Sequence, residues 1–79
     1  MKAKVLISLK EGVLDPQAKA IAHALYVHGF ESLQNVKLSK EIILDLDESD
    51  AQKAYKIVQN MCEELLANVV IENYAIEIL

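Results

Sequence analysis

The stretch SLQNVKLSKEIILDLD, residues 32–47, alternates apolar and polar side chains with the period of two that is typical of β-strands. Its apolar residues form two groups that each keep one parity, Val36 and Leu38 in the first and Ile42, Leu44 and Leu46 in the second. We interpret Ser39-Lys40 as a tight turn between two strands, although Asn-Gly or Asp-Gly is the preferred turn pair. The stretch is therefore predicted to be a β-hairpin.

A strand and a helix are predicted before this hairpin. The segment from Ala3 to Leu9 alternates as a strand does, and Gly12 ends it. Asp15-Pro16 is a helix start, because an aspartate side chain can cap free backbone N–H groups and proline is tolerated at the first helical position. The helix runs over 17–28 with one apolar stripe, and Gly29 closes it as a left-handed cap.

A second helix and a last strand follow the hairpin. The acidic run of residues 47–50 offers capping oxygens ahead of the helix. One helical face collects the apolar residues Ala51, Ala54, Tyr55, Val58, Met61, Cys62 and Leu65. After Asn68, the segment VVIENYAIEIL returns to alternation and is predicted to be a strand whose Tyr74, Ile76 and Ile78 face inward.

The order of these elements is strand, helix, strand, strand, helix, strand, which indicates an α+β fold of the ferredoxin-like, split βαβ type. Right-handed crossovers predict a four-stranded antiparallel sheet with both helices on one face and with the first and third strands central. The other face of the sheet stays uncovered. Such a face, or an edge strand, is where a contact between subunits is expected.

Size and composition predict a single domain over residues 1–79. The chain has 79 residues, 53% of them hydrophobic, with two Gly and one Pro. A chain this short buries only about 60% of the surface that its unfolded form exposes, so its stability margin is small and oligomerisation is a common remedy. We therefore expect a homo-oligomer, a dimer or larger.

The charge balance argues against nucleic acid as a partner. Twelve acidic residues stand against eight Lys and no Arg, which gives a net charge of −4, whereas phosphate backbones favour basic surfaces. No stretch approaches the roughly 18 to 20 apolar residues of a membrane-spanning helix, so no membrane role is expected. A single cysteine and a charged N-terminal segment without the layout of a signal peptide make the cytoplasm the expected location.

No group of residues predicts catalysis or a metal site. His23 and His28 lie about 140° apart around one helix and cannot share a metal. Cys62 lies on an apolar stripe, where a packing thiol is expected. The acidic cluster is better explained by a strand end and a helix start than by a cation site; its members are Asp45, Asp47, Glu48 and Asp50. We therefore predict no activity for the chain alone, no catalytic residues and no bound cofactor.

Three stretches are similar to the PurS family of formylglycinamidine synthase subunits: VLDPQ at 13–17 after a strand ending in LKEG, a helix ending in HGF, and CEELLANVVIENYAIEI at 62–78. The resemblance covers essentially the whole chain. The sequence departs from the family pattern at Ala18, at Val69 after the Asn and at Ser39 before Lys40. These departures concern turns and caps rather than apolar positions.

The resemblance implies a bridging subunit of a glutamine amidotransferase in purine biosynthesis. Its implied partners are a PurL-like synthetase subunit, which uses ATP, and a PurQ-like glutaminase subunit, which releases ammonia from glutamine. The resemblance also suggests partner contacts at polar positions beside strand ends. These candidates are Lys10, Asp15, Pro16, Gln17, Asn68, Ile71 and Glu72.

Two other functions remain as alternatives. A regulatory module of the same topology could bind a small molecule at a dimer interface, and glycine-rich loops would favour it, but the chain has only Gly12 and Gly29. An RNA-binding sheet needs exposed strand aromatics in basic surroundings. The only strand aromatic is Tyr74, and its parity is inward.

Overall fold

The computed structural model describes all residues, 1–79. Its elements are, in chain order, β1 (Lys2–Leu9), α1 (Pro16–Val27), β2 (Ser39–Asp45), α2 (Ala51–Met61), the π-helical turn η1 (Cys62–Leu66) and β3 (Glu72–Ile78). None of the helices has both the length and the apolar character needed to cross a bilayer. The predicted α+β composition is confirmed, and the two helices and the first and last strands lie within a few residues of their predicted positions.

The three strands form one antiparallel sheet with the order β2-β1-β3. The central strand is β1, and its Val5 lies opposite Ile42 of β2 and Ile76 of β3. Because side chains alternate between the two faces of a strand, these three residues lie on the same face. The register therefore collects the inward apolar residues of all three strands on one side of the sheet.

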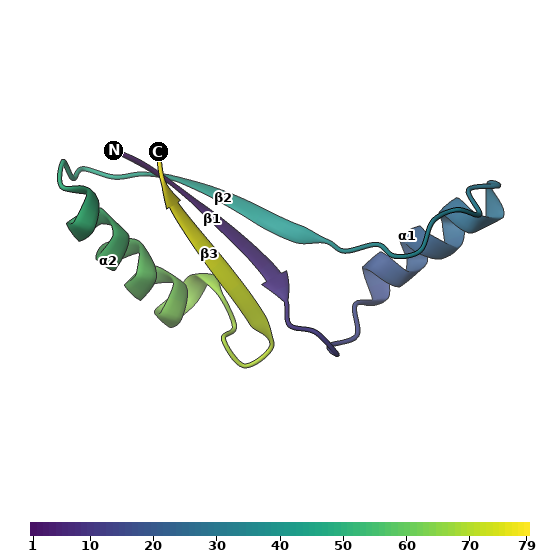
Figure 1. Ribbon diagram of the computed structural model, residues 1–79. Helices are drawn as coiled ribbons and strands as arrows, with labels where there is room; N and C mark the ends of the chain where they lie inside the picture. The colour runs from purple at the N-terminus through teal and green to yellow at the C-terminus, as the bar shows by residue number, and fades with distance from the viewer.

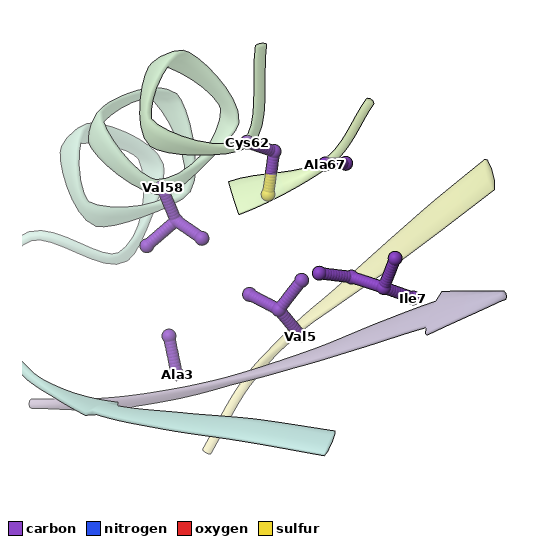
Figure 2. Packing of buried hydrophobic residues seen from close by; sticks show 6 residues of the cluster. All are labelled: Ala3, Val5, Ile7, Val58, Cys62 and Ala67. Carbon is purple, nitrogen blue, oxygen red and sulfur yellow. The ribbon is translucent and has the colours of Figure 1, made fainter. Parts of the chain in front are cut away.

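The core lies between this face and the second helical segment (Figure 2). Val58 of α2 and Cys62 of η1 face the β1 residues, and both are fully buried. Fully burying a valine or isoleucine side chain stabilises a fold by about 1.5–3 kcal/mol relative to exposure. The six buried members of this cluster are Ala3, Val5, Ile7, Val58, Cys62 and Ala67.

The prediction of a four-stranded sheet is wrong. The expected turn at Ser39-Lys40 is absent, β2 begins at Ser39, and the residues before it, 34–38, belong to no strand. A two-residue turn at this pair would place Leu38 opposite Glu41, and so on the face away from Ile42. Val36 and Leu38 have the same even parity as the inward residues of β2, and the stretch has no Gly or Asn-Gly pair to reverse it. The chain therefore runs on instead of folding back.

The prediction that both helices cover one face of the sheet is also wrong. Only α2 packs on the sheet, against β3 and β1, while α1 extends away from it (Figure 1). Ala18 is the only buried residue of α1. The molecule measures 49 × 24 × 14 Å with a radius of gyration of 16.1 Å, compared with about 12 Å expected for a compact domain of this length. Because the second predicted strand is missing, the third, β2, is an edge strand instead of a central one.

Candidate partner-contact site

The polar residues predicted as partner contacts gather at one end of the sheet. Lys10 follows β1, Asp15 precedes α1, and Glu72 begins β3. Asp15, Gln17 and Glu72 line one open groove of about 410 Å³, together with residues of β1 and of 38–40. Lys10 lines a neighbouring groove of about 300 Å³ that also includes Asp15. The structure thus brings together segments that lie more than fifty residues apart in the chain.

The loop from Asn68 to Glu72 closes on itself through hydrogen bonds. The Asn68 side chain accepts from Val70 N at 3.2 Å, and its backbone carbonyl accepts from Ile71 N and Glu72 N at 3.0 and 2.7 Å. In return, Glu72 Oε1 accepts from Asn68 N at 2.7 Å. The Ile71 carbonyl accepts from Lys10 N at 2.8 Å, which joins the loop to the end of β1. Asn68 therefore has a turn role of its own, apart from any partner.

Lys40 also lies at this end of the sheet, although it was not among the predicted contact residues. Its Nζ lies 3.7 Å from Glu72 Oε2, with side chains that are 66% and 16% exposed respectively. The mostly buried Glu72 carboxylate thus accepts a hydrogen bond from Asn68 N through Oε1 and forms an ion pair with Lys40 through Oε2. The only sign of this ion pair in the sequence is that Lys40 has the same parity as Leu38 and Ile42.

Asp15 and Pro16 form the predicted helix start. Asp15 Oδ1 accepts from Gln17 N at 3.0 Å and from Ala18 N at 3.1 Å, and Pro16 is the first residue of α1. At the other end, Gly29 has a φ of 96°, the left-handed backbone conformation expected of a helix-closing glycine. Capping therefore accounts for the Asp15 carboxylate without a partner.

We expect Asp15→Ala to lower the free energy of unfolding by about 0.5–2 kcal/mol, the usual loss for a helix N-cap. The measurement is the urea midpoint followed by circular dichroism at 222 nm. Asp15→Asn is the matched control, because an asparagine side chain can still accept the same two backbone N–H groups. Equal midpoints for the alanine variant and the wild type would contradict the cap.

Cys62 and Tyr74 both have a pKa above the ordinary value. Burial, followed by the neighbouring Glu63 carboxylate, raises the pKa of the Cys62 thiol. A hydrogen bond with Glu63, followed by burial, raises the pKa of Tyr74. A thiol that is fully buried and neutral is a poor nucleophile, because the thiolate is the reactive form.

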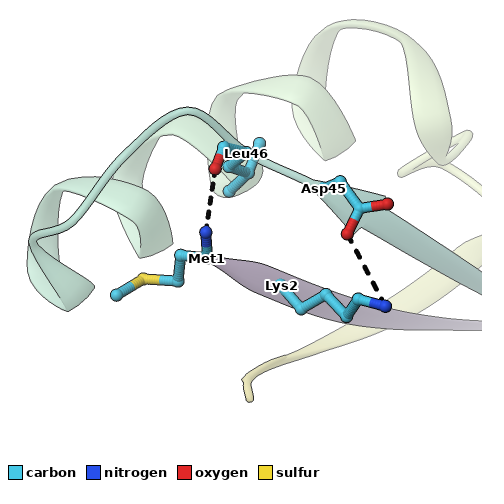
Figure 3. A network of polar contacts seen from close by, with 4 residues as sticks. All are labelled: Met1, Lys2, Asp45 and Leu46. Carbon is cyan, nitrogen blue, oxygen red and sulfur yellow. Dashed lines mark hydrogen bonds and ion pairs between the residues drawn. The ribbon is translucent and has the colours of Figure 1, made fainter.

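The acidic cluster contributes to local structure as well. Asp50 Oδ1 caps α2 by accepting from Gln52 N at 2.9 Å and Lys53 N at 3.3 Å. Glu48 accepts from the backbone N–H groups of the two residues that follow it. Asp45 lies 3.7 Å from Lys2 Nζ, across the β1–β2 pair (Figure 3). No three His, Cys, Asp or Glu side chains are placed so that they could hold a metal ion.

Comparison with known proteins finds one family over almost the whole chain. Residues 2–79 match the family model described as "PurS: Phosphoribosylformylglycinamidine (FGAM) synthase". The chain is 46% identical over 77 residues to phosphoribosylformylglycinamidine synthase subunit PurS of Bacillus subtilis, covering 98% of this chain and 90% of that protein. It is 41% identical over 76 residues to the PurS subunit of Archaeoglobus fulgidus, covering 96% and 95%.

Solved structures agree with the sequence matches. The Methanocaldococcus jannaschii PurS structure, of a subunit of formylglycinamide ribonucleotide amidotransferase, superposes with a TM-score of 0.87 at 41% identity and covers 96% of this chain and 92% of that one. A chain of the PurLQS structure from Thermotoga maritima superposes with a TM-score of 0.88 at 32% identity, covering 99% and 95%. The extended shape, with α1 away from the sheet, therefore matches structures of related proteins.

Proposed function

Because this chain belongs to the PurS family of phosphoribosylformylglycinamidine synthase subunits, we propose that it is the bridging subunit of that ATP- and glutamine-dependent ligase complex in purine biosynthesis. In this role the chain joins a glutaminase subunit to a synthetase subunit and itself carries out no chemistry. ATP and glutamine are used by the complex and are not ligands of this chain. The bridge works as a homo-oligomer, which presents more than one copy of each contact surface.

The observation that carries this proposal is the full-length match to the chain of the Thermotoga maritima PurLQS structure. The chemistry of the side chains supports it, since the one cysteine is buried and the polar residues beside the grooves serve caps, turns and ion pairs. The small-molecule regulatory alternative has less support, because both grooves at the polar end are open to solvent, whereas small-molecule pockets bury most of the ligand's surface.

The assembly experiment mixes purified synthetase and glutaminase subunits with and without this chain and separates them by size-exclusion chromatography. We expect the two large subunits to co-elute only when the chain is present, because it supplies the contacts between them. Equal co-elution without the chain would contradict the bridging role.

The same experiment tests whether the polar end of the sheet contacts a partner. We expect Lys10→Glu to weaken assembly by about tenfold or more, because reversing a charge within a complementary contact costs over 1 kcal/mol. Lys10 contributes only its backbone N–H and carbonyl to the fold, and its side chain makes no hydrogen bond or ion pair within the chain, so the variant should remain folded. Lys56→Glu on the exposed surface of α2 is the matched control. If both variants assemble as the wild type does, Lys10 makes no partner contact.

A further inference from the structure

The last strand, β3, forms one border of the sheet (Figure 1). On its inner side it pairs with β1 in one continuous register from Glu72 to Ile78, and its outer side faces no other strand. Edge strands are commonly protected by lysine, proline or a bulge. The strand sequence ENYAIEI contains neither lysine nor proline, and its continuous register leaves no bulge. This edge is therefore open to a strand from another chain.

Two hydrogen bonds at the ends of the β1–β3 pair show which backbone groups of β3 point outward. Leu79 N donates to Lys2 O at 2.9 Å, and Lys10 N donates to Ile71 O at 2.8 Å. In an antiparallel ladder, the residues that bond to one neighbouring strand recur at every second position. The odd-numbered residues of β3 therefore bond to β1. The even-numbered residues direct their N–H and C=O groups to the free edge, and those left without a partner are Tyr74, Ile76 and Ile78.

The side chains along this edge indicate what a docked strand would contact. Tyr74, Ile76 and Ile78 are half-buried and pack against the core. Directly opposite residues of neighbouring strands share a face of the sheet. Every second side chain of an added strand would therefore lie next to these three residues, where apolar side chains extend the core. Its other side chains would lie on the outer face, beside the exposed Ala75 and Glu77.

The charges near this edge are acidic. Residues 57–79 contain four glutamates and neither lysine nor histidine. Glu72 and Glu77 form ion pairs with lysines that approach from the inner strands β2 and β1, at 3.7 and 3.6 Å. Glu63, which contacts Tyr74, has no such partner. Because complementary charges favour association and like charges oppose it, a strand with basic side chains fits this edge better than a second acidic copy of β3.

Of the two larger subunits in the proposed function, the synthetase is the better source of a basic strand. It uses ATP, and proteins recognise phosphate groups with lysine and arginine side chains. The glutaminase acts on glutamine, which has no phosphate. We therefore expect the synthetase to be the more basic of the two partners.

We propose that the outer edge of β3 docks a strand of the synthetase subunit in which apolar side chains alternate with basic ones. The docked strand bonds to the free backbone groups of Tyr74, Ile76 and Ile78, as in other cases where a strand is added to a sheet edge. Its apolar side chains extend the core, and its basic side chains lie near the glutamates. This inference rests on the proposed function and names the surface that holds one of the two partners.

Binding of the purified full chain to the purified synthetase subunit, measured by isothermal titration calorimetry, tests this docking. We expect Ile76→Pro to weaken binding about tenfold or more, because proline lacks the N–H that the docked strand uses. Proline is tolerated where the N–H of an edge strand faces solvent, so the bonds to β1 remain. Ile76→Ala is the matched control: it also loses the isoleucine side chain but keeps the N–H, and it should bind more tightly than Ile76→Pro.

A second pair of variants tests the charge and places no proline in the sheet. Ala75 is exposed on the outer face, so a longer side chain there should leave the sheet intact. We expect Ala75→Lys to weaken binding about tenfold, because it sets a lysine beside a basic strand. Ala75→Glu is the matched control and should bind at least as tightly as the wild type. The difference between the two variants should shrink at high salt.

Equal binding of the wild type, Ile76→Pro and Ala75→Lys would overturn the docking and leave the bridging role intact. If circular dichroism shows that Ile76→Pro is unfolded, the two Ala75 variants decide alone. A wild-type chain that does not bind the synthetase would contradict the bridging role, and this docking with it. The proposal would also be wrong if these substitutions weakened binding to the glutaminase instead, or if they lowered the mass of the chain alone in sedimentation equilibrium, which would indicate a second copy at the edge.

Discussion

A complex reconstituted without this chain should lose about a hundredfold or more of its glutamine-dependent synthesis, because the bridge holds the ammonia source at high effective concentration beside the synthetase. Ammonia-dependent synthesis should keep most of its rate, since ammonium salts in solution bypass the glutaminase. The measurement compares initial rates with glutamine and with ammonium chloride, each with and without the chain. The isolated chain should show no glutaminase, ATPase or synthetase activity.

The effect of the chain on the glutamine-dependent rate, compared with its effect on the ammonia-dependent rate, decides the outcome. Equal glutamine-dependent rates with and without the chain would refute the bridging role. A parallel loss with both nitrogen sources would instead indicate that the chain supports the synthetase itself. Adding the chain back at stoichiometric amounts should restore the glutamine-dependent rate, which excludes damage to the other subunits as the cause.

Replacing the buried valine of α2 should unfold the protein. Val58 has no exposed surface and lies against Val5 and Cys62 in the only core (Figure 2). Val58→Asp would leave a carboxylate there without a partner, and an uncompensated buried charge costs more than about 3 kcal/mol. A small domain has little more stability than that to lose. Far-UV circular dichroism at 25 °C should therefore show an unfolded chain.

Val70→Asp is the matched control for this substitution. Val70 is 79% exposed in the loop before β3, so the same chemical change there leaves the carboxylate in water. We expect its free energy of unfolding to lie within about 0.5 kcal/mol of that of the wild type, as is usual for surface substitutions. If Val58→Asp were as stable as Val70→Asp, the packing of α2 on the sheet would be wrong.

Both helices and the first and last strands could be predicted because their signals are local. Asp15-Pro16 starts α1 and Gly29 ends it, as expected from capping and from the left-handed conformation that glycine allows. The inward parity of Tyr74, Ile76 and Ile78 was also predicted correctly, since all three are half-buried and pack against the core.

The candidate site could be predicted only in part. Asp15, Gln17 and Glu72 were predicted as contact residues from their places beside strand ends, and the structure adds that they line one groove. Lys40 was missed because its ion pair with Glu72 depends on β2 and β3 lying on either side of β1. That adjacency is a property of the sheet order, which no local pattern contains. Whether any of these residues contacts a partner stays a prediction.

The sequence by itself determined where both helices and the first and last strands form and which face of each is apolar, because capping, glycine conformation and side-chain alternation act over a few residues. Only the tertiary structure decided that residues 34–38 continue straight into β2 and that α1 leaves the sheet. The physical reason lies at Ser39-Lys40. Alternation looks the same in a hairpin and in one long extended segment, so the parity of Val36 and Leu38 is compatible with both. The difference is whether the backbone groups of 34–38 pair with another strand of the same chain, and in this structure they do not.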